Sequence, residues 1–152
     1  MKCVIQRVKE ASVSISGAVK GKIGNGLLLF IGFTHSDTKE MVPKLIQKCL
    51  KLRLFNDSAG KMNLSVQDIA GGVLVISQFT LYADCKKGRR PSFVDAMSPD
   101  KARELYTHFL DILKESYPTV ESGEFGADMK VSLINDGPVT IVLEQECVYA
   151  LA

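Results

Sequence analysis

The chain has few of the residues that hydrolases and metal sites use most: two histidines and four cysteines in 152 residues. The cysteines form no C-x-x-C pair and no cluster with histidine, so we expect reduced thiols and no zinc or other metal. They are Cys3, Cys49, Cys85 and Cys147. The longest apolar stretch, residues 26–33, is too short to cross a membrane, and residues 1–4 lack the layout of a signal peptide. The lack of paired cysteines, of a membrane-spanning stretch and of a signal peptide indicates a cytoplasmic protein without a membrane partner.

The two histidines offer little for a catalytic triad. His108 falls on a polar helical face, so it is expected to point into solvent. His35 follows an expected strand and could act as a base, although its interpretation as a loop residue facing water is favoured. The chain has no Gly-x-Ser-x-Gly motif, no His-x-Glu pair and no Rossmann or Walker glycine pattern. A Ser-His-Asp, Cys-His or metal-water hydrolase therefore has no obvious set of residues.

Composition is ordinary for a globular protein, with 46% hydrophobic and 24% charged residues. We find no internal repeat, linker or low-complexity tract, so residues 1–152 are expected to form a single domain. The net charge of +2 is small. Any affinity for nucleic acid must therefore come from a local patch.

Alternation of apolar and polar residues predicts several half-buried strands, and residues 26–33, apolar on both faces, predict a central covered strand. The expected strands are Lys2–Val8, Ala11–Ser16, Ala18–Ile23, Gly26–Phe33, Val73–Tyr82, Asp128–Ile134 and Val139–Glu144. Because strands run together with two helices inserted, the pattern indicates an α+β fold around a curved, mainly antiparallel sheet.

Two segments have helical periodicity. Apolar residues between Met41 and Leu50 predict the first helix, and Asp37 with Glu40 resembles a capping box. Pro43 implies that this helix either bends in its first turns or begins later than the box suggests. In the second helix, Ser98 is the expected cap and Pro99 the first residue, with one apolar stripe continuing toward Pro118.

Residues 77–81, Ser-Gln-Phe-Thr-Leu, end an apolar run and change from burial to polar presentation. The hydroxyls of Ser77 and Thr80 are poor nucleophiles without an adjacent base, and a purely structural role for them stays open. Backbone N–H groups released at a strand end can instead point at a carbonyl oxygen and form an oxyanion hole. This segment is therefore a candidate site for ester chemistry.

Two further segments stand out. Residues 135–140, Asn-Asp-Gly-Pro-Val-Thr, place Gly137-Pro138 in an expected turn between two alternating runs. Most X–Pro bonds are trans, so the residues alone favour a trans bond there.

The second segment is a basic run around Gly88, which is either a solvated loop or a set of phosphate contacts. Its cations are Lys86, Lys87, Arg89 and Arg90.

Several segments in order along nearly the whole chain resemble the D-aminoacyl-tRNA deacylase family. They are residues 6–8, 11–13, 60–66, 77–81, 87–93, 126–129 and 135–140. The resemblance implies a barrel-like deacylase fold and hydrolysis of the ester of D-aminoacyl-tRNA, with glycyl-tRNA as a further substrate. It also implies no cofactor, a tRNA partner and not DNA, and a homodimer with active sites at the subunit interface.

The resemblance also assigns roles to residues. Ser77, Gln78, Phe79 and Thr80 would form the catalytic strand end. A second set of residues would bind the substrate and reject L-amino acids. In this set the Gly-Pro bond would be cis, and its carbonyl groups would line the pocket of the partner subunit. The members of the set are Gly137, Pro138, Arg7 and Met129. The basic run would contact tRNA.

Three mechanisms or functions stay open. In the favoured one, the oxyanion is held by the N–H groups of Phe79 and Thr80, and the tRNA 2′-hydroxyl supplies the missing base. An acyl-enzyme hydrolase using Thr80 is the second possibility. A non-catalytic RNA-binding module is the third, and it leaves Gly137-Pro138 without a purpose.

Overall fold

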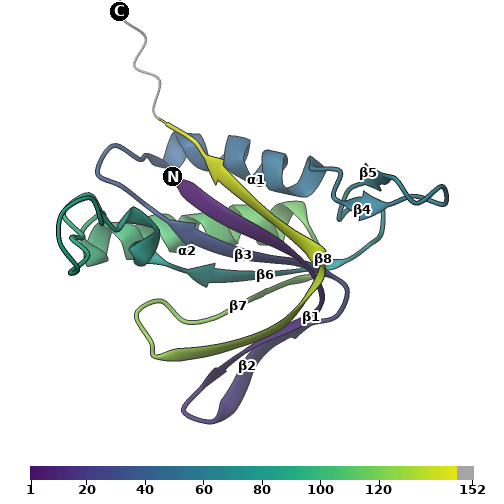
Figure 1. The fold of residues 1–152 in the computed structure, drawn as a ribbon, viewed down its shortest axis with the longest axis horizontal. Coiled ribbons are helices and arrows are strands. Elements are labelled where there is room, and N and C mark those ends of the chain that lie inside the picture. Colours follow the sequence, from purple (N-terminus) through teal and green to yellow (C-terminus); the bar gives the residue numbers. More distant parts are fainter. Residues whose placement is uncertain (147–152) are drawn as a thin grey trace, which may run out of the picture.

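A computed structural model describes residues 1–146, and Cys147 lies outside this range. One mixed sheet is covered on one face by the two main helices, α1 (Val42–Lys51) and α2 (Pro99–Ser116) (Figure 1). The strands are β1 (Lys2–Ile15), β2 (Ala18–Ile23), β3 (Gly26–Gly32), β4 (Phe55–Asn56), β5 (Met62–Leu64), β6 (Gly72–Ser77), β7 (Val120–Ser122) and β8 (Met129–Glu144). Two short 3-10 helices, η1 (Lys39–Met41) and η2 (Phe79–Tyr82), complete the order.

The long strand β1 organises the sheet. Its first half pairs antiparallel with β3, its second half with β2, and both halves pair with β8. Two separate strands were expected in this region, at 2–8 and 11–16. They are one strand because β8 continues alongside both halves and supplies partners across the polar step at Lys9 and Glu10.

The strand order is β2-β1-β3-β6-β7, with β8 paired to β1. β3 and β6 are parallel, as are β6 and β7, and a helix lies in each of these two crossovers. The sheet curves until β2 meets β7, where a Cβ added at Gly21 would lie 3.1 Å from the Ser122 carbonyl oxygen. The α+β class, the curved sheet and the two helices are thus confirmed, although the sheet is mixed.

Two apolar cores lie on opposite faces of the sheet. Cys3 and Ile5 of β1 point toward α1 and α2, whereas Val8 and Val13 point into the strongly curved end. β3 lies between β1 and β6 and is almost wholly buried, as its apolar sequence predicts. Cys49 of α1 joins the first core. Contact with the Cys49 thiol and burial raise the pKa of Cys3 well above its ordinary value, so that thiol stays protonated.

The first helix begins later than its apparent capping box. α1 starts at Val42 with Pro43 in its first turn, where a missing N–H costs nothing. Asp37 does not cap it, so that prediction is wrong: its carboxylate accepts hydrogen bonds from the Met1 ammonium at 2.7 Å and from the Thr34 N–H at 2.8 Å. For α2, Ser98 is the N-cap residue and Pro99 the first residue, as expected.

None of the helices within residues 1–146 is both long enough and apolar enough to cross a membrane. Within the same range, no three His, Cys, Asp or Glu side chains gather as metal ligands. His35 does not stand free in its loop. Its Nε2 lies 2.7 Å from the Val94 carbonyl oxygen and joins two loops at the end of the sheet.

Candidate active site

The candidate segment, residues 77–80, lies at the carboxyl end of β6, but the backbone there differs from the extended strand predicted to run to Tyr82. β6 ends at Ser77, and residues 79–82 form η2. The Gln78 N–H still donates to the Ile31 carbonyl at 2.7 Å, and the chain then turns. Gly32 permits this approach, since a Cβ there would lie 2.6 Å from the Gln78 carbonyl oxygen.

The turn has a chemical consequence. The first N–H groups of a helical turn have no carbonyl partner within that turn. Phe79 and Thr80 occupy those first positions of η2, and the first bond of the turn is made by Leu81 to the Gln78 carbonyl. Two neighbouring N–H groups are thus available to hold a developing oxyanion.

The side chains of the segment do not assemble a catalytic base. The Gln78 side-chain amide donates to the Thr80 hydroxyl, which is exposed. Phe79 is 56% exposed and packs edge-on against Phe93, with ring centroids 5.1 Å apart. An amide donor beside Thr80 would not accept its proton, so the arrangement disfavours this hydroxyl as a nucleophile.

A cleft of about 590 Å³ opens beside the segment, within the usual range for small-molecule sites. Ser77, Gln78, Phe79 and Met129 are among the residues that line it. Several further lining residues were not identified as site residues from the sequence, among them Met97, Ala102 and Phe125. The only signal for Met97 and Phe125 was nearness to the segments at 87–93 and 126–129, and Ala102 belonged to the apolar stripe of the second helix.

Gly137-Pro138 does not lie in a hairpin turn, and the expectation of two separate strands there is wrong. Residues 129–144 form the single strand β8, because both halves pair with β1. Between the pairs Gln6–Thr140 and Val8–Asn135, β8 has four residues where β1 has one. Residues 136–139 therefore form a bulge, and the Gly137–Pro138 peptide bond within it is cis.

Arg7 lies directly beneath this bulge and is 7% exposed. Its Nε donates to the Asp136 carbonyl at 2.8 Å, and its Nη1 donates to the Leu54 carbonyl at 2.6 Å. The Asn135 side chain bonds both backbone groups of Val139, at 2.7 and 3.1 Å. The bulge is thus fixed from below while Gly137 and Pro138 remain exposed at the surface.

Within one chain, the bulge and the candidate segment lie at opposite ends of the sheet. Ser77 pairs with Ile31, which pairs with Cys3, whereas Arg7 pairs with Leu27 at the other end of β3. Along β3, Leu27 and Ile31 are four residues apart, so the two sets of paired residues are separated by about 13 Å. The expected pocket containing Phe79 together with Pro138 is therefore not formed within one chain.

The basic run lies near the cleft on an exposed loop. Asp84 and Ser92 exchange two backbone hydrogen bonds at 2.7 and 2.9 Å, and the Lys86 N–H donates to the Asp84 carboxylate. All four cations are exposed, and none forms an ion pair within the part of the chain that the structure describes. The loop leads directly to Phe93, which packs on Phe79. Its charge is therefore free to meet a ligand entering the cleft.

Comparison with known proteins agrees with this geometry. The family model for D-Tyr-tRNA(Tyr) deacylase matches residues 4–144. A D-aminoacyl-tRNA deacylase of Thermosipho melanesiensis is 50% identical over 150 residues, covering 98% of this chain and all of the relative.

Two solved structures share the fold. The c-Myc DNA Unwinding Element Binding Protein has a TM-score of 0.92 and 40% identity, covering 97% of this chain and all of that one. A probable eukaryotic D-amino acid tRNA deacylase has a TM-score of 0.82 over 93% of this chain and 97% of its own, at 17% identity. The second likeness shows the fold alone.

Fold and sequence together define an ester hydrolase of the aminoacyl-tRNA deacylase class. The chain belongs to the D-Tyr-tRNA(Tyr) deacylase family, whose model spans all but the first three residues and the last eight. The resemblance seen in the sequence is thereby confirmed. The roles of individual residues stay predictions.

Proposed function

We propose that the protein removes D-amino acids, and glycine, from tRNA by hydrolysing the ester to the 3′-terminal adenosine, while L-aminoacyl-tRNA is rejected. The observation that carries this proposal is the cleft at the end of β6, with two N–H groups at its edge and no histidine among its lining residues. The one carboxylate that lines it, Asp128, is exposed and bound by Lys130 Nζ at 2.8 Å. Such a site suits a substrate that supplies its own proton acceptor. Cytoplasmic tRNA is the partner we expect.

Selection for the D-configuration requires a rigid obstacle near the substrate Cα. The bulge of β8 has this character, because Arg7 and Asn135 fix its backbone and leave Gly137 and Pro138 exposed. Since it cannot reach the cleft of its own chain, we propose that the protein is a homodimer in which each bulge enters the partner's cleft. Its carbonyl groups would clash with an L side chain, and glycine would escape because it has none.

The proposed reaction is a hydrolysis without covalent intermediate. A water oxygen attacks the ester carbonyl carbon, and the N–H groups of Phe79 and Thr80 bind the oxyanion. The ribose 2′-hydroxyl relays the water proton toward the 3′-oxygen. The bond between that oxygen and the carbonyl carbon then breaks, releasing the free amino acid and the tRNA 3′-hydroxyl.

The experiment that tests this function uses one tRNA charged with D-tyrosine, L-tyrosine or glycine. We expect the enzyme to hydrolyse the D-tyrosyl and glycyl esters well above the spontaneous rate and to leave the L-tyrosyl ester unchanged. Equal hydrolysis of both tyrosyl esters would refute chiral selection. Absence of hydrolysis beside stable tRNA binding would favour a non-catalytic RNA-binding module.

The side chain of Thr80 is expected to matter little. Thr80→Ala removes the hydroxyl and keeps the backbone N–H, so kcat should fall by less than about tenfold. Loss of a true nucleophile costs several orders of magnitude. Single-turnover rates on D-tyrosyl-tRNA measure the difference, and Ser77→Ala is the matched loss of a hydroxyl on the neighbouring strand end. A drop of about a thousandfold or more in Thr80→Ala alone would restore the acyl-enzyme mechanism.

The basic loop is expected to contact phosphates. Replacing Lys87 and Arg89 by glutamine should weaken tRNA binding and lower the slope of log K against log salt by roughly one unit for each phosphate interaction removed. Lys20→Gln with Lys22→Gln on β2 is the control for net charge, and duplex DNA is the competitor that tests the preference for RNA. Binding with the same slope as the unmodified protein would return the loop to a merely solvated role.

A further inference from the structure

The exposed face of α1 carries charge of one sign. Lys44, Lys48 and Lys51 are exposed, while the opposite side of the helix is buried in the core. At 3.6 residues per turn, positions 44, 48 and 51 lie within about 60° of one another. At about 1.5 Å per residue they span about 10 Å along the helix. We call these three side chains the lysine row.

No acidic residue of α1 neutralises this row. Residues 42–56 contain no Asp or Glu, and Arg53 extends the positive charge beyond the helix. Within residues 1–146, none of the three lysines forms an ion pair. A helix exposed merely for solubility usually mixes both signs.

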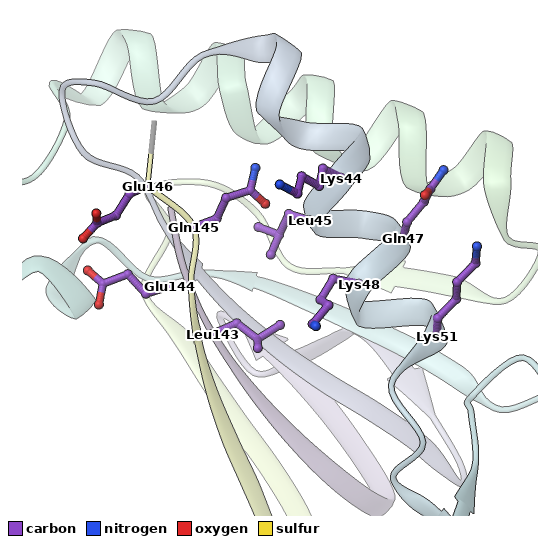
Figure 2. Close-up of a pocket in the computed structure, with 9 residues that line it drawn as sticks. All are labelled: Lys44, Leu45, Gln47, Lys48, Lys51, Leu143, Glu144, Gln145 and Glu146. Atoms are coloured by element: carbon purple, nitrogen blue, oxygen red, sulfur yellow. The ribbon is translucent and has the colours of Figure 1, made fainter. Parts of the chain in front are cut away.

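The row borders a groove of about 680 Å³ between α1 and the end of β8 (Figure 2). Lys44 and Lys48 point from α1 toward this groove, whose floor includes Leu45 and Leu143. Glu144 and Glu146 also line the groove, and their carboxylates point to the side of β8 away from the helix. Glu144 is engaged there by Lys2, with 3.7 Å between Nζ and Oε1. The groove therefore keeps its positive wall.

The position of α1 ties the row to the bulge. The chain leaves α1 at Lys51 and reaches Leu54, whose carbonyl accepts the hydrogen bond from Arg7 Nη1. Arg7 in turn holds the Asp136 carbonyl next to Gly137. The C-terminal end of the lysine row is thus connected to the bulge through Leu54 and Arg7.

From these observations we infer that the lysine row is a second phosphate-binding surface, separate from the basic loop, that contacts the sugar-phosphate backbone of the tRNA acceptor stem. The inference rests on the proposed function, in which the bulge enters the partner's cleft. The row then lies beside a tRNA whose 3′ end occupies that cleft. Its charge positions the duplex and reads no base.

The test replaces all three lysines by glutamine, which preserves helix propensity. The readouts are binding of uncharged tRNA at several salt concentrations and kcat/KM on D-tyrosyl-tRNA. Because three cations no longer meet phosphates, the slope of log K against log salt should fall by about two to three units, and the affinity by roughly tenfold or more at about 0.15 M salt. Lys20→Gln with Lys22→Gln shows the effect of removing two positive charges elsewhere on the surface, and circular dichroism tests whether the helix is retained.

A short substrate separates this surface from the site itself. D-tyrosine esterified to a 3′-terminal CCA trinucleotide lacks the stem, so the ratio of kcat/KM on full tRNA to that on the trinucleotide should fall about tenfold in the triple variant. An unchanged slope and an unchanged ratio would overturn the inference. If the unmodified enzyme hydrolyses neither ester, the proposed function fails, while the salt slope with uncharged tRNA still decides the lysine row.

Discussion

Replacing Gly137 by alanine is expected to lower kcat/KM on D-tyrosyl-tRNA by about a hundredfold. The residue has φ +143°, a backbone conformation that L-residues rarely adopt. An added Cβ would lie 2.8 Å from Val139 Cγ2 and 3.0 Å from Arg7 Nη2. Arg7 is held by two carbonyl groups and cannot yield without losing them, so the bulge must shift. A misplacement of about 1 Å near a reacting group can cost about 10²-fold in rate.

Gly60→Ala is the matched control for this prediction. Gly60 also has a positive φ, +77°, but an added Cβ would meet nothing within 4 Å. Both variants therefore replace a glycine that has a positive φ, and only Gly137→Ala meets a steric obstacle in the bulge. Steady-state kinetics should show a large loss in one and near-normal activity in the other. Equal, small losses in both would mean that the bulge has no part in the reaction.

A tRNA ending in 2′-deoxyadenosine and charged with D-tyrosine at its 3′-hydroxyl is expected to be hydrolysed at least about a hundredfold more slowly. General base catalysis contributes about 10²–10⁴-fold. The residues that line the cleft offer no histidine, and their one carboxylate, Asp128, is bound by Lys130. The ribose 2′-hydroxyl is the remaining group next to the ester. Removing it leaves the proposed oxyanion hole intact, so the loss should appear in the single-turnover rate.

The control for the deoxy substrate is its spontaneous hydrolysis, since the 2′-hydroxyl also affects the ester in water. The quantity to compare is the enzyme's acceleration over that background for each substrate. A normal acceleration of the deoxy ester, together with an inactive but folded Thr80→Ala, would contradict the substrate-assisted mechanism. That pair of results would make Thr80 the nucleophile.

Local pattern was sufficient for the elements whose own residues decide their structure. The two-sided apolar run at 26–33 correctly predicted a covered strand, and Ser98-Pro99 correctly predicted the start of α2. The end of β6 was misjudged because Phe79 and Tyr82 have high strand propensity. The chain turns there because it approaches the backbone of Gly32, some 45 residues earlier in the sequence.

The bulge shows a second limit. Asn135-Asp136-Gly137 has the composition of a hairpin turn, and only its pairing with β1 makes it part of a continuous strand. The residue that fixes it, Arg7, is 129 positions from Asp136. Asp37 misled in the same way, since its main partner is the Met1 ammonium and not a helix terminus. Periodicity carries no information about such distant contacts.

The arrangement of the proposed site could not be predicted from local sequence patterns, because the proposal divides the site between two chains. Residues 77–80 and Gly137-Pro138 were identified as candidates from the sequence, and the resemblance to a family supplied the expectation that two subunits share a site. The structure places the two segments at opposite ends of β6 and β3, which apolar periodicity and turn composition alone do not indicate. It is this separation that requires a partner subunit in the proposed mechanism.

Complementation between two damaged subunits tests the shared site most directly. Gly137→Ala damages the bulge, and Ala127→Trp fills the cleft that residue 127 lines. If each site combines the cleft of one chain with the bulge of the other, a mixed dimer of the two variants contains one intact site. We predict that dissociating and reassociating the two inactive homodimers together restores about a quarter of the normal D-tyrosyl-tRNA hydrolysis, with L-tyrosyl-tRNA still spared. Mixed dimers that form and remain inactive would contradict a site shared between subunits.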